Sequence, residues 1–259
     1  MKKITLISFV LILILGLSFS VSAHFQLILP TDETISANED EEIGIQLIFT
    51  HPMEASHSMD MDKPVKFGVL NKGREKSLLE ELESFTFDGA KSWKTLYETR
   101  SPGDYIFYLE PAPYYEEGKD LYLTQYTKIV VNKMGMPTDW EKELGQKAEI
   151  IPLTRPYGIW TGNVFRGVVK RDGKVVPNTK VMVEYLNSSA FTEFNDAGIF
   201  MPAESFNRQY VKTDSNGVFS YGIPKAGWWG FGAMMKGDKI DGKTHKIGGV
   251  IWIKAHDME

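Results

Sequence analysis

The sequence contains no cysteine among its 259 residues. No disulfide bond is therefore available, and the fold must be stabilised by ordinary burial of apolar side chains. The absence also excludes thiolate as a metal ligand or nucleophile, and it excludes the acylated cysteine of a lipoprotein. At 259 residues, the chain is long enough to bury a large apolar core without disulfide bonds.

Basic charge and catalytic motifs are also scarce. Lys and Arg number 29 against 34 Asp and Glu, which gives a formal net charge of −5. This balance disfavours nucleic acid and anionic membrane surfaces as partners. The hydrolase motifs G-x-S-x-G and H-E-x-x-H are missing, so we expect a binding protein and no enzyme.

Long apolar runs are absent apart from one, which extends from Ile4 to Val21. Lys2 and Lys3 precede this run, and Ser22 and Ala23 follow it, which is the pattern of a secretory signal peptide. We therefore expect residues 1–23 to be removed and the protein to be periplasmic or extracellular. If the run stayed uncleaved, it is long enough to act as an N-terminal membrane anchor.

The rest of the chain is rich in short strand patterns. β-Branched and aromatic runs are bounded by Gly, Pro, Asn or Asp, which favours antiparallel strands packed as sandwiches. Short helical turns are expected only around residues 77–83 and 139–144. The predicted strands are Ile43–Phe49, Lys66–Leu70, Tyr105–Leu109, Tyr122–Val131, Val164–Lys170 and Lys180–Tyr185.

Two domains are predicted on either side of a proline-bracketed linker. Pro152 and Pro156 lie in the segment 151–160, and proline is excluded from central strands. Beyond it, Asp172-Gly173 and Asn216-Gly217 are typical of tight turns between strands. We expect an all-β protein with two immunoglobulin-like or prealbumin-like β-sandwich domains, residues 24–150 and 161–259, after a cleaved signal peptide.

Cleavage of the signal would make His24 the first residue. An N-terminal histidine offers a metal both its α-amine and its imidazole Nδ1 in one chelate ring, and nitrogen ligands suit Ni(II), Cu(II) and Zn(II). Alternatively, His24 is an arbitrary polar residue after a cleavage site, with no role of its own.

The segment from Thr50 to Asp62 concentrates further ligand types. In an extended chain, residues of one parity share a face, so such a row can converge on one ion. Imidazole suits Ni(II) and Cu(II), whereas thioethers prefer Cu(I). The alternative is a polar loop whose methionines fill gaps in the core. The candidate ligands all occupy odd positions: His51, Met53, His57, Met59 and Met61.

Several segments are similar to the DUF4198 family of exported proteins. They are A-H-F at 23–25, T-H-P-M-E at 50–54, M-D-M-D-K-P-V-K-F-G-V at 59–69, Y-L-T-Q-Y-T-K-I-V-V-N at 122–132, K-A-E-I-I-P-L-T-R-P-Y-G-I-W-T-G-N-V-F at 147–165 and G-W-W-G-F at 227–231. The resemblance implies extracytoplasmic handling of Ni(II) and delivery to the membrane components of a nickel or cobalt importer of the energy-coupling-factor type. The positions it matches are His24 and His51, and His57 and the methionines are a local addition.

Two other functions fit the same residues. A periplasmic copper chaperone or resistance protein would use Met53, Met59 and Met61 beside the histidines. A copper polysaccharide monooxygenase would also begin with a chelating histidine, and Tyr105, Tyr108 and other tyrosines could then bind sugar. Copper binds a given nitrogen site more tightly than nickel, so affinity alone does not separate these hypotheses.

Overall fold

The computed structural model describes residues 24–54, 57–188, 191 and 199–258. The predicted signal peptide, residues 1–23, lies outside these ranges. The described chain is almost entirely β-structure, as predicted from the sequence. Helical structure there is confined to short 3-10 turns, including η1 (Leu79–Glu81), η2 (Glu117–Lys119) and η4 (Glu204–Phe206). No helix in the described ranges has the length and apolar character needed to cross a bilayer.

The first sheet has four antiparallel strands in the order β1-β3-β7-β6. Apolar side chains alternate along β3, where Ile43, Ile45 and Leu47 are buried, which is the pattern of a strand with one covered face. The strands are β1 (Phe25–Pro30), β3 (Glu42–Thr50), β7 (Ala90–Glu98) and β6 (Glu83–Phe87).

The second sheet has 11 strands and runs through both predicted domains. Its centre is the parallel pair β10 and β19, which is aligned from Leu121 opposite Thr244 to Ile129 opposite Trp252. The main path is β16 (Gln209–Lys212), β15 (Lys180–Tyr185), β18 (Gly227–Lys236), β19 (Thr244–His256), β10 (Leu121–Lys133), β8 (Gly103–Glu110), β4 (Lys66–Asn71) and β5 (Arg74–Ser77). The short strands β2 (Thr34–Ile35) and β9 (Tyr114–Glu116) pair with β10, and β12 (Ile159–Trp160) pairs with β19.

The third sheet has four strands from the C-terminal half. Asp172 and Gly173 have φ values of 48° and 73°, so the predicted tight turn between β13 and β14 is confirmed. Asp214 Oδ1 accepts the backbone N–H groups of Asn216 and Val218, at 2.8 and 2.9 Å, in the second predicted turn. The strands are β11 (Ala148–Pro152), β13 (Val164–Arg171), β14 (Lys174–Val175) and β17 (Val218–Gly222).

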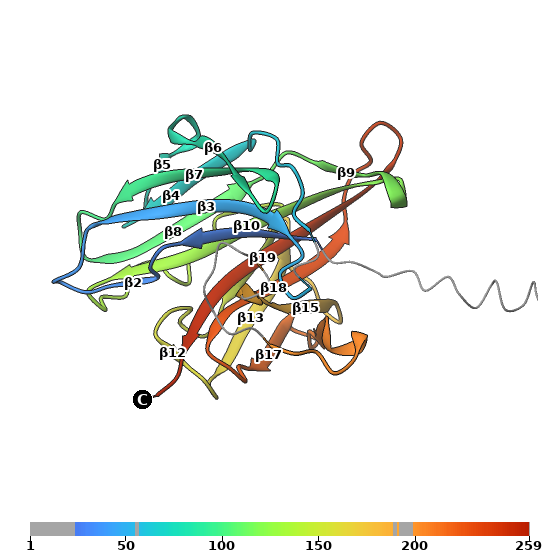
Figure 1. The fold of residues 1–259 in the computed structure, drawn as a ribbon. Helices are drawn as coiled ribbons and strands as arrows, with labels where there is room; N and C mark the ends of the chain where they lie inside the picture. Colours follow the sequence, from blue (N-terminus) through green and yellow to red (C-terminus); the bar gives the residue numbers. More distant parts are fainter. Residues whose placement is uncertain (1–23, 55–56, 189–190, 192–198, 259) are drawn as a thin grey trace, which may run out of the picture.

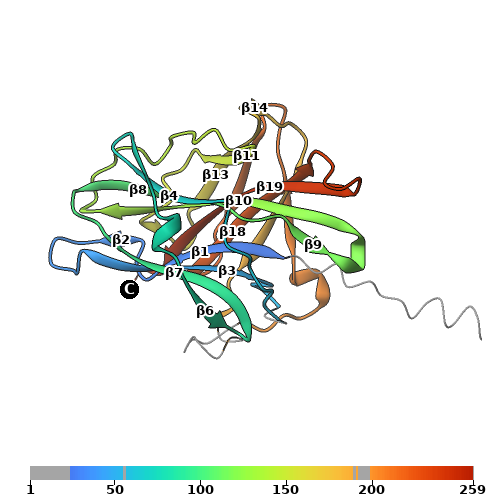
Figure 2. The ribbon, with the colours of Figure 1, turned by 90° about the horizontal axis from the view of Figure 1, so that it is seen from above.

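The three sheets stack around the long strands β10 and β19. In Figure 1, β3 and β7 lie in the upper half and β13 and β17 in the lower half, with β10 and β19 side by side between them. Seen from above, β1 crosses over the region of β18 and β19 (Figure 2), where the Trp252 Nε1–H donates to the carbonyl of Gln26 at 2.9 Å. We call residues 24–150 the N-terminal lobe and residues 161–259 the C-terminal lobe.

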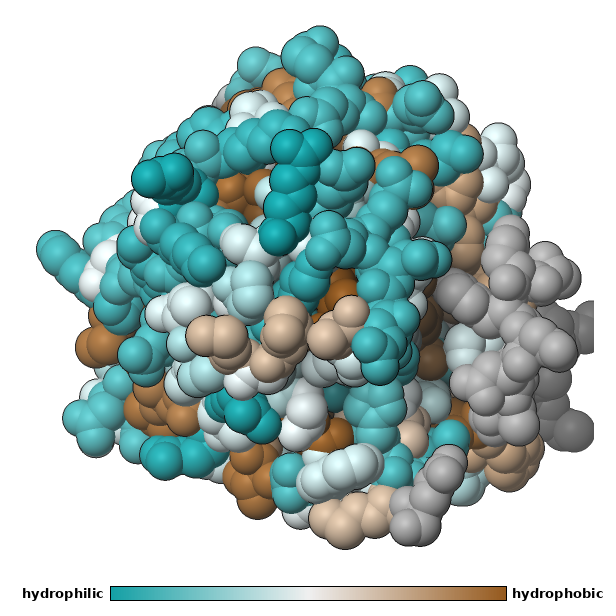
Figure 3. Space-filling view, turned by 90° about the vertical axis from the view of Figure 1, so that its left-hand side faces the viewer, coloured by the Kyte–Doolittle hydropathy of each residue, from teal (hydrophilic) through white to brown (hydrophobic). Residues whose placement is uncertain are grey.

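Two large apolar clusters form the core. One joins the first sheet to Val250, Trp252, Leu186 and other residues of the C-terminal lobe, so the two lobes share part of their interior. The second lies mostly within the C-terminal lobe, around residues such as Phe231. On the face shown in Figure 3, hydrophilic residues predominate and apolar ones are scattered, as expected when the large apolar side chains are inside.

Close packing between β19 and β11 depends on a glycine. A Cβ atom at Gly249 would lie 2.6 Å from the backbone nitrogen of Glu149, closer than real Cβ contacts come. Any other residue at this position would therefore push β11 away from β19.

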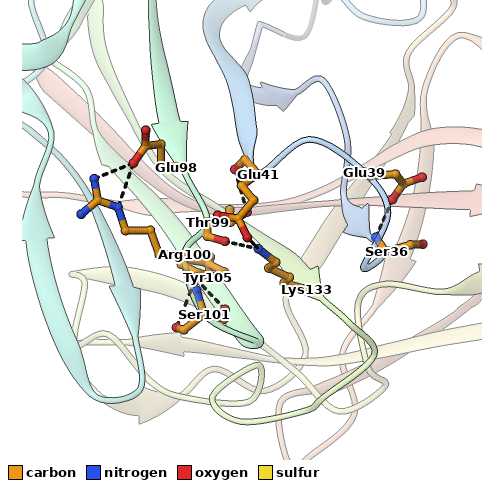
Figure 4. Close-up of polar contacts among 9 residues, drawn as sticks. All are labelled: Ser36, Glu39, Glu41, Glu98, Thr99, Arg100, Ser101, Tyr105 and Lys133. Atoms are coloured by element: carbon orange, nitrogen blue, oxygen red, sulfur yellow. Dashed lines mark hydrogen bonds and ion pairs between the residues drawn. The ribbon is translucent and has the colours of Figure 1, made fainter.

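Buried polar side chains fix the ends of strands in the N-terminal lobe (Figure 4). Lys133, at the end of β10, donates to Glu41 Oε1 and to the carbonyl of Thr99, both at 2.6 Å. Tyr105 donates its hydroxyl proton to the carbonyl of Ser101 at 2.7 Å. These contacts hold the turns before β3 and after β7 against the central sheet.

The six strands predicted from the sequence are all present, with boundaries that differ by a few residues at most. The predicted helical turn at 77–83 is the 3-10 turn η1. In the second predicted stretch, residues 139–142 form a single turn closed by a hydrogen bond from Lys142 N to Asp139 O at 2.8 Å. Because one sheet spans both lobes, the division into two domains stays a prediction.

Candidate metal site

Strand register brings two of the predicted histidines together. His24 immediately precedes β1, and His51 immediately follows β3. In the antiparallel β1–β3 pair, Phe25 lies opposite Thr50. The residue before one strand therefore lies beside the residue after the other, so that two histidines 27 positions apart in the sequence become neighbours.

The third histidine, His57, lies at the site because the chain after His51 folds back against the end of β3. Ser58 forms an isolated antiparallel bridge with Thr50, and Met59 N donates to Phe49 O at 2.8 Å. His57 therefore lies next to His51. One ring nitrogen from each of His24, His51 and His57 lies within 4.8 Å of the other two.

The three imidazole rings contact one another directly. His24 and His51 are stacked, with ring centroids 4.6 Å apart and an angle of 17° between their planes. His57 stands edge-on to His51, at 4.4 Å and 83°. An imidazole nitrogen binds a metal with a lone pair in the plane of its ring, so two stacked rings cannot both point at one ion. One of the stacked rings must turn when a metal binds.

Burial keeps the two inner imidazoles neutral. His24 and His51 are buried, whereas His57 is exposed. Loss of solvation on burial lowers the pKa of His24 to about 4, against the opposing charge of Glu116. Burial and then the charges of the other two histidines lower the pKa of His51 to about 3. Neutral imidazole is the form that binds metals, so at neutral pH neither ring has to lose a proton before it binds.

Residues that the sequence analysis did not single out hold His24 in place. Gln125 Nε2 donates to the His24 carbonyl at 2.6 Å, and Gln125 Oε1 accepts Gln26 N–H at 2.7 Å. Glu116 Oε2 lies 3.9 Å from His24 Nδ1, and Glu116 Oε1 is paired with Lys119 at 2.6 Å. Gln125 lies in the predicted strand 122–131, where Thr124, Thr127 and Lys128 are also polar, so the sequence did not mark it out. Glu116 had no signal in the sequence.

The predicted methionine ligands lie in the core. Met59 and Met61 belong to the shared apolar cluster, and Met61 Sδ accepts an N–H of Gln26 at 3.4 Å. Met53 belongs to the cluster of the C-terminal lobe. The three methionines are buried whereas His57 is exposed, and metal binding by their thioethers stays a prediction.

The two remaining histidines lie elsewhere, each with its own contacts. His245 Nε2 is 2.9 Å from Thr124 Oγ1, and His245 Nδ1 is 3.0 Å from Asp238 O. His256 Nε2 contacts the buried carboxylate of Glu33. These contacts make His245 a suitable control for experiments on the site.

Acidification is expected to destabilise the metal-free protein through the two buried imidazoles. Their pKa values fall from 6.5 in the unfolded chain to about 4 and about 3 in the fold. At pH values between the folded and unfolded pKa values, the unfolded state binds more protons than the folded state. The free energy of unfolding therefore falls as the pH is lowered from about 6.5 towards about 4. Thermal unfolding followed across this range with a chelator present should show the loss.

His51→Gln should flatten this pH profile, because the amide does not titrate, and His245→Ala should leave most of the slope in place. If the wild-type and His51→Gln profiles have the same slope, the buried imidazole of His51 is not the group responsible.

The comparisons with known proteins give a family and weak structural likenesses. A family model described as "Domain of unknown function (DUF4198)" matches residues 21–237. No curated protein matches the sequence significantly.

Among solved structures, the adhesin InvE of Yersinia pseudotuberculosis is 13% identical, with 87% of this chain and 58% of that chain covered and a TM-score of 0.22. The latent dimeric PorU of Porphyromonas gingivalis is 12% identical, with 90% and 20% covered and a TM-score of 0.25. A tandem of titin immunoglobulin domains is 8% identical, with 91% and 100% covered and a TM-score of 0.19. The chain spans less than two thirds of the InvE and PorU chains. Likeness at this level transfers no function.

Proposed function

The chain belongs to the DUF4198 family, and from its histidine cluster we propose that it is an extracytoplasmic nickel-binding protein that delivers its ion to a membrane importer. The observation that carries the proposal is the convergence of His24, His51 and His57 within 4.8 Å. Three imidazole nitrogen donors at this spacing suit a first-row transition metal, and the absence of cysteine excludes thiolate donors.

The position of His24 supports export as part of the function. Removal of residues 1–23 would place a free α-amine on the residue that already lies in the cluster. The amine and Nδ1 of His24 would then close one chelate ring, with His51 and His57 completing a four-nitrogen set. Four nitrogen donors favour Ni(II) and Cu(II) over Mg(II) and Ca(II), which prefer oxygen.

The burial of the ligands suits an ion that is carried and later released. His51 is 2% exposed, whereas His57 is exposed, so the ion would enter and leave from the side of His57. An importer of the energy-coupling-factor type would receive the ion there. The membrane components of that importer are the partner we propose.

The phenotype of a strain that lacks the gene distinguishes a nickel-delivery function from a copper-handling function. Copper binds most nitrogen sites more tightly, so a higher copper affinity in vitro is expected for either function. Loss of the gene should impair nickel-dependent enzymes when nickel is limiting and leave copper tolerance unchanged. Loss of copper tolerance with normal nickel-dependent activity would instead identify a copper-handling protein.

A calorimetric titration with Ni(II) tests the site directly. Protein that begins at His24 should bind one ion tightly, and the same protein with one added Gly before His24 should bind much more weakly, because the added residue removes the α-amine from the chelate ring. His245→Ala in the chain that begins at His24 is the matched control and should bind as the wild type does.

Equal binding by the two chains would place the ion on side chains alone and contradict the role of the α-amine. If neither chain bound Ni(II), the proposal that the protein binds nickel would be wrong.

A further inference from the structure

His24 and His51 both belong to the N-terminal lobe, but the segment that follows His51 is hydrogen-bonded to the C-terminal lobe. His51 is followed by Pro52 and Met53, and the backbone carbonyls of both accept hydrogen bonds from Asn187. We infer that Asn187 is a positioning residue for the metal site, through which the C-terminal lobe sets the affinity for the ion. The inference rests on the proposed function and names a residue that sets how tightly the site binds the ion.

Asn187 uses its hydrogen-bonding groups to connect two backbone segments. Its N–H donates to Pro52 O at 2.9 Å, and its Nδ2 donates to Met53 O and to Ile199 O, both at 3.3 Å. Its Oδ1 accepts the N–H of Ile199 at 2.9 Å. Asn187 is 6% exposed. Replacement of its side chain would keep the backbone bond to Pro52 O but would leave the buried Met53 carbonyl without its amide partner.

The side chain of Met53 forms a second attachment on the same segment. Met53 is 6% exposed and packs in the apolar cluster around Tyr185 and Trp229 of the C-terminal lobe. Leu186 follows β15 directly, and its N–H donates to Trp228 O at 2.9 Å, which fixes the backbone that leads to Asn187. The segment after His51 is therefore held by backbone bonds and by packing, both from the same lobe.

The position of His51 then depends on two lobes at once. On one side Thr50 pairs with Phe25 in the β1–β3 ladder, and on the other side the side-chain Nδ2 of Asn187 donates to Met53 O. Metal affinity is sensitive to small displacements of a ligand, and loss of a residue that orients a ligand typically weakens binding about 10–100-fold. Loosening the contact at Asn187 should weaken binding and speed release without removing any ligand.

Asn132 offers a matched control in the same molecule. It is also buried, at 1% exposed, and its Nδ2 donates to Asp104 Oδ1 at 2.7 Å and to Met136 O at 3.0 Å. It lies at the end of β10, paired with Thr34 and Asp104. Seven strand residues, roughly 23 Å, separate it from Gln125, the residue of β10 that contacts His24. Asn132→Ala should lower stability by the same kind of loss but leave the site intact.

The experiment compares Asn187→Ala, Asn132→Ala and the wild type, each beginning at His24. Ni(II) affinity is measured by competition with a chromophoric chelator, the release rate by stopped-flow with excess chelator, and the thermal midpoint without metal. Asn187→Ala should bind Ni(II) about 10–100-fold more weakly and release it faster. Asn132→Ala should lower the thermal midpoint and leave affinity and release unchanged. If Asn187→Ala does not fold, Asn187→Ser serves in its place.

Each outcome bears on a different statement. If both variants change affinity equally, or if Asn187→Ala binds and releases Ni(II) as the wild type does, the inference about Asn187 is wrong while nickel binding by the wild type stands. If the wild type binds no Ni(II), the proposed function itself fails.

Discussion

Replacing His51 by alanine is expected to abolish tight Ni(II) binding. His51 is the central member of the cluster, since its ring centroid lies 4.6 Å from that of His24 and 4.4 Å from that of His57. The substitution removes one donor and leaves only His24 and His57, whose ring centroids lie 6.5 Å apart. The loss should therefore exceed the roughly 10–100-fold that follows removal of a residue that only orients a ligand. Calorimetry and chelator competition at about pH 7 measure it, where the remaining imidazole of His24 is neutral.

The controls for this experiment use the other histidines. His245→Ala removes an imidazole that bonds to Thr124 and should leave Ni(II) affinity unchanged. His57→Ala should weaken binding less than His51→Ala, because His57 is exposed and water can take its place on the ion. The proposal of a three-histidine site would not survive a His51→Ala protein that binds Ni(II) with wild-type affinity.

A large loss of stability is expected when the buried carboxyl group of Glu149 is neutralised. Glu149 Oε1 lies 2.7 Å from Lys128 Nζ, and both side chains are 1% exposed. Burial lowers the pKa of Lys128, and the charge of Glu149 opposes this. Glu149→Gln leaves the ammonium group of Lys128 buried without its counter-charge, which typically costs about 3–5 kcal/mol. Chemical unfolding of the metal-free protein measures the change.

A double substitution distinguishes the lost counter-charge from lost hydrogen bonds. The carboxylate of Glu149 also accepts the backbone N–H groups of Leu144 at 2.9 Å and Gly145 at 3.1 Å, and an introduced glutamine oxygen retains an acceptor there. Lys128→Met combined with Glu149→Gln removes the stranded ammonium group, so it should recover much of the stability lost by Glu149→Gln alone. A double variant as unstable as Glu149→Gln would contradict the assignment.

The same pair predicts a pH dependence of the same sense as that of the histidines, but at higher pH. In Glu149→Gln, burial without a counter-charge lowers the pKa of Lys128 further, so the unfolded state binds more protons than the fold below the ordinary lysine pKa. The stability of this variant should therefore rise relative to the wild type as the pH is raised from about 7 to about 10. Lys128→Met/Glu149→Gln should lack the rise.

The sequence by itself determined the strand-rich fold and the candidate ligands. Strand patterns depend on alternation between neighbouring residues, so β3, β8 and β10 were found from local sequence. The absence of cysteine and the clustering of histidine in the segment 50–62 limited the possible metal donors to a few residues. These properties are local, and they need no knowledge of which strands pair.

Only the tertiary structure decided which candidates meet. The register of Phe25 with Thr50 places His24 against His51, and pairing between distant strands cannot be derived from the period of either one. The same holds for Gln125, Glu116 and Asn187, which reach the site from distant segments. The methionines shared the parity of the histidines, but the apolar clusters of both lobes enclose them, because burial is decided by the layers that a strand packs against.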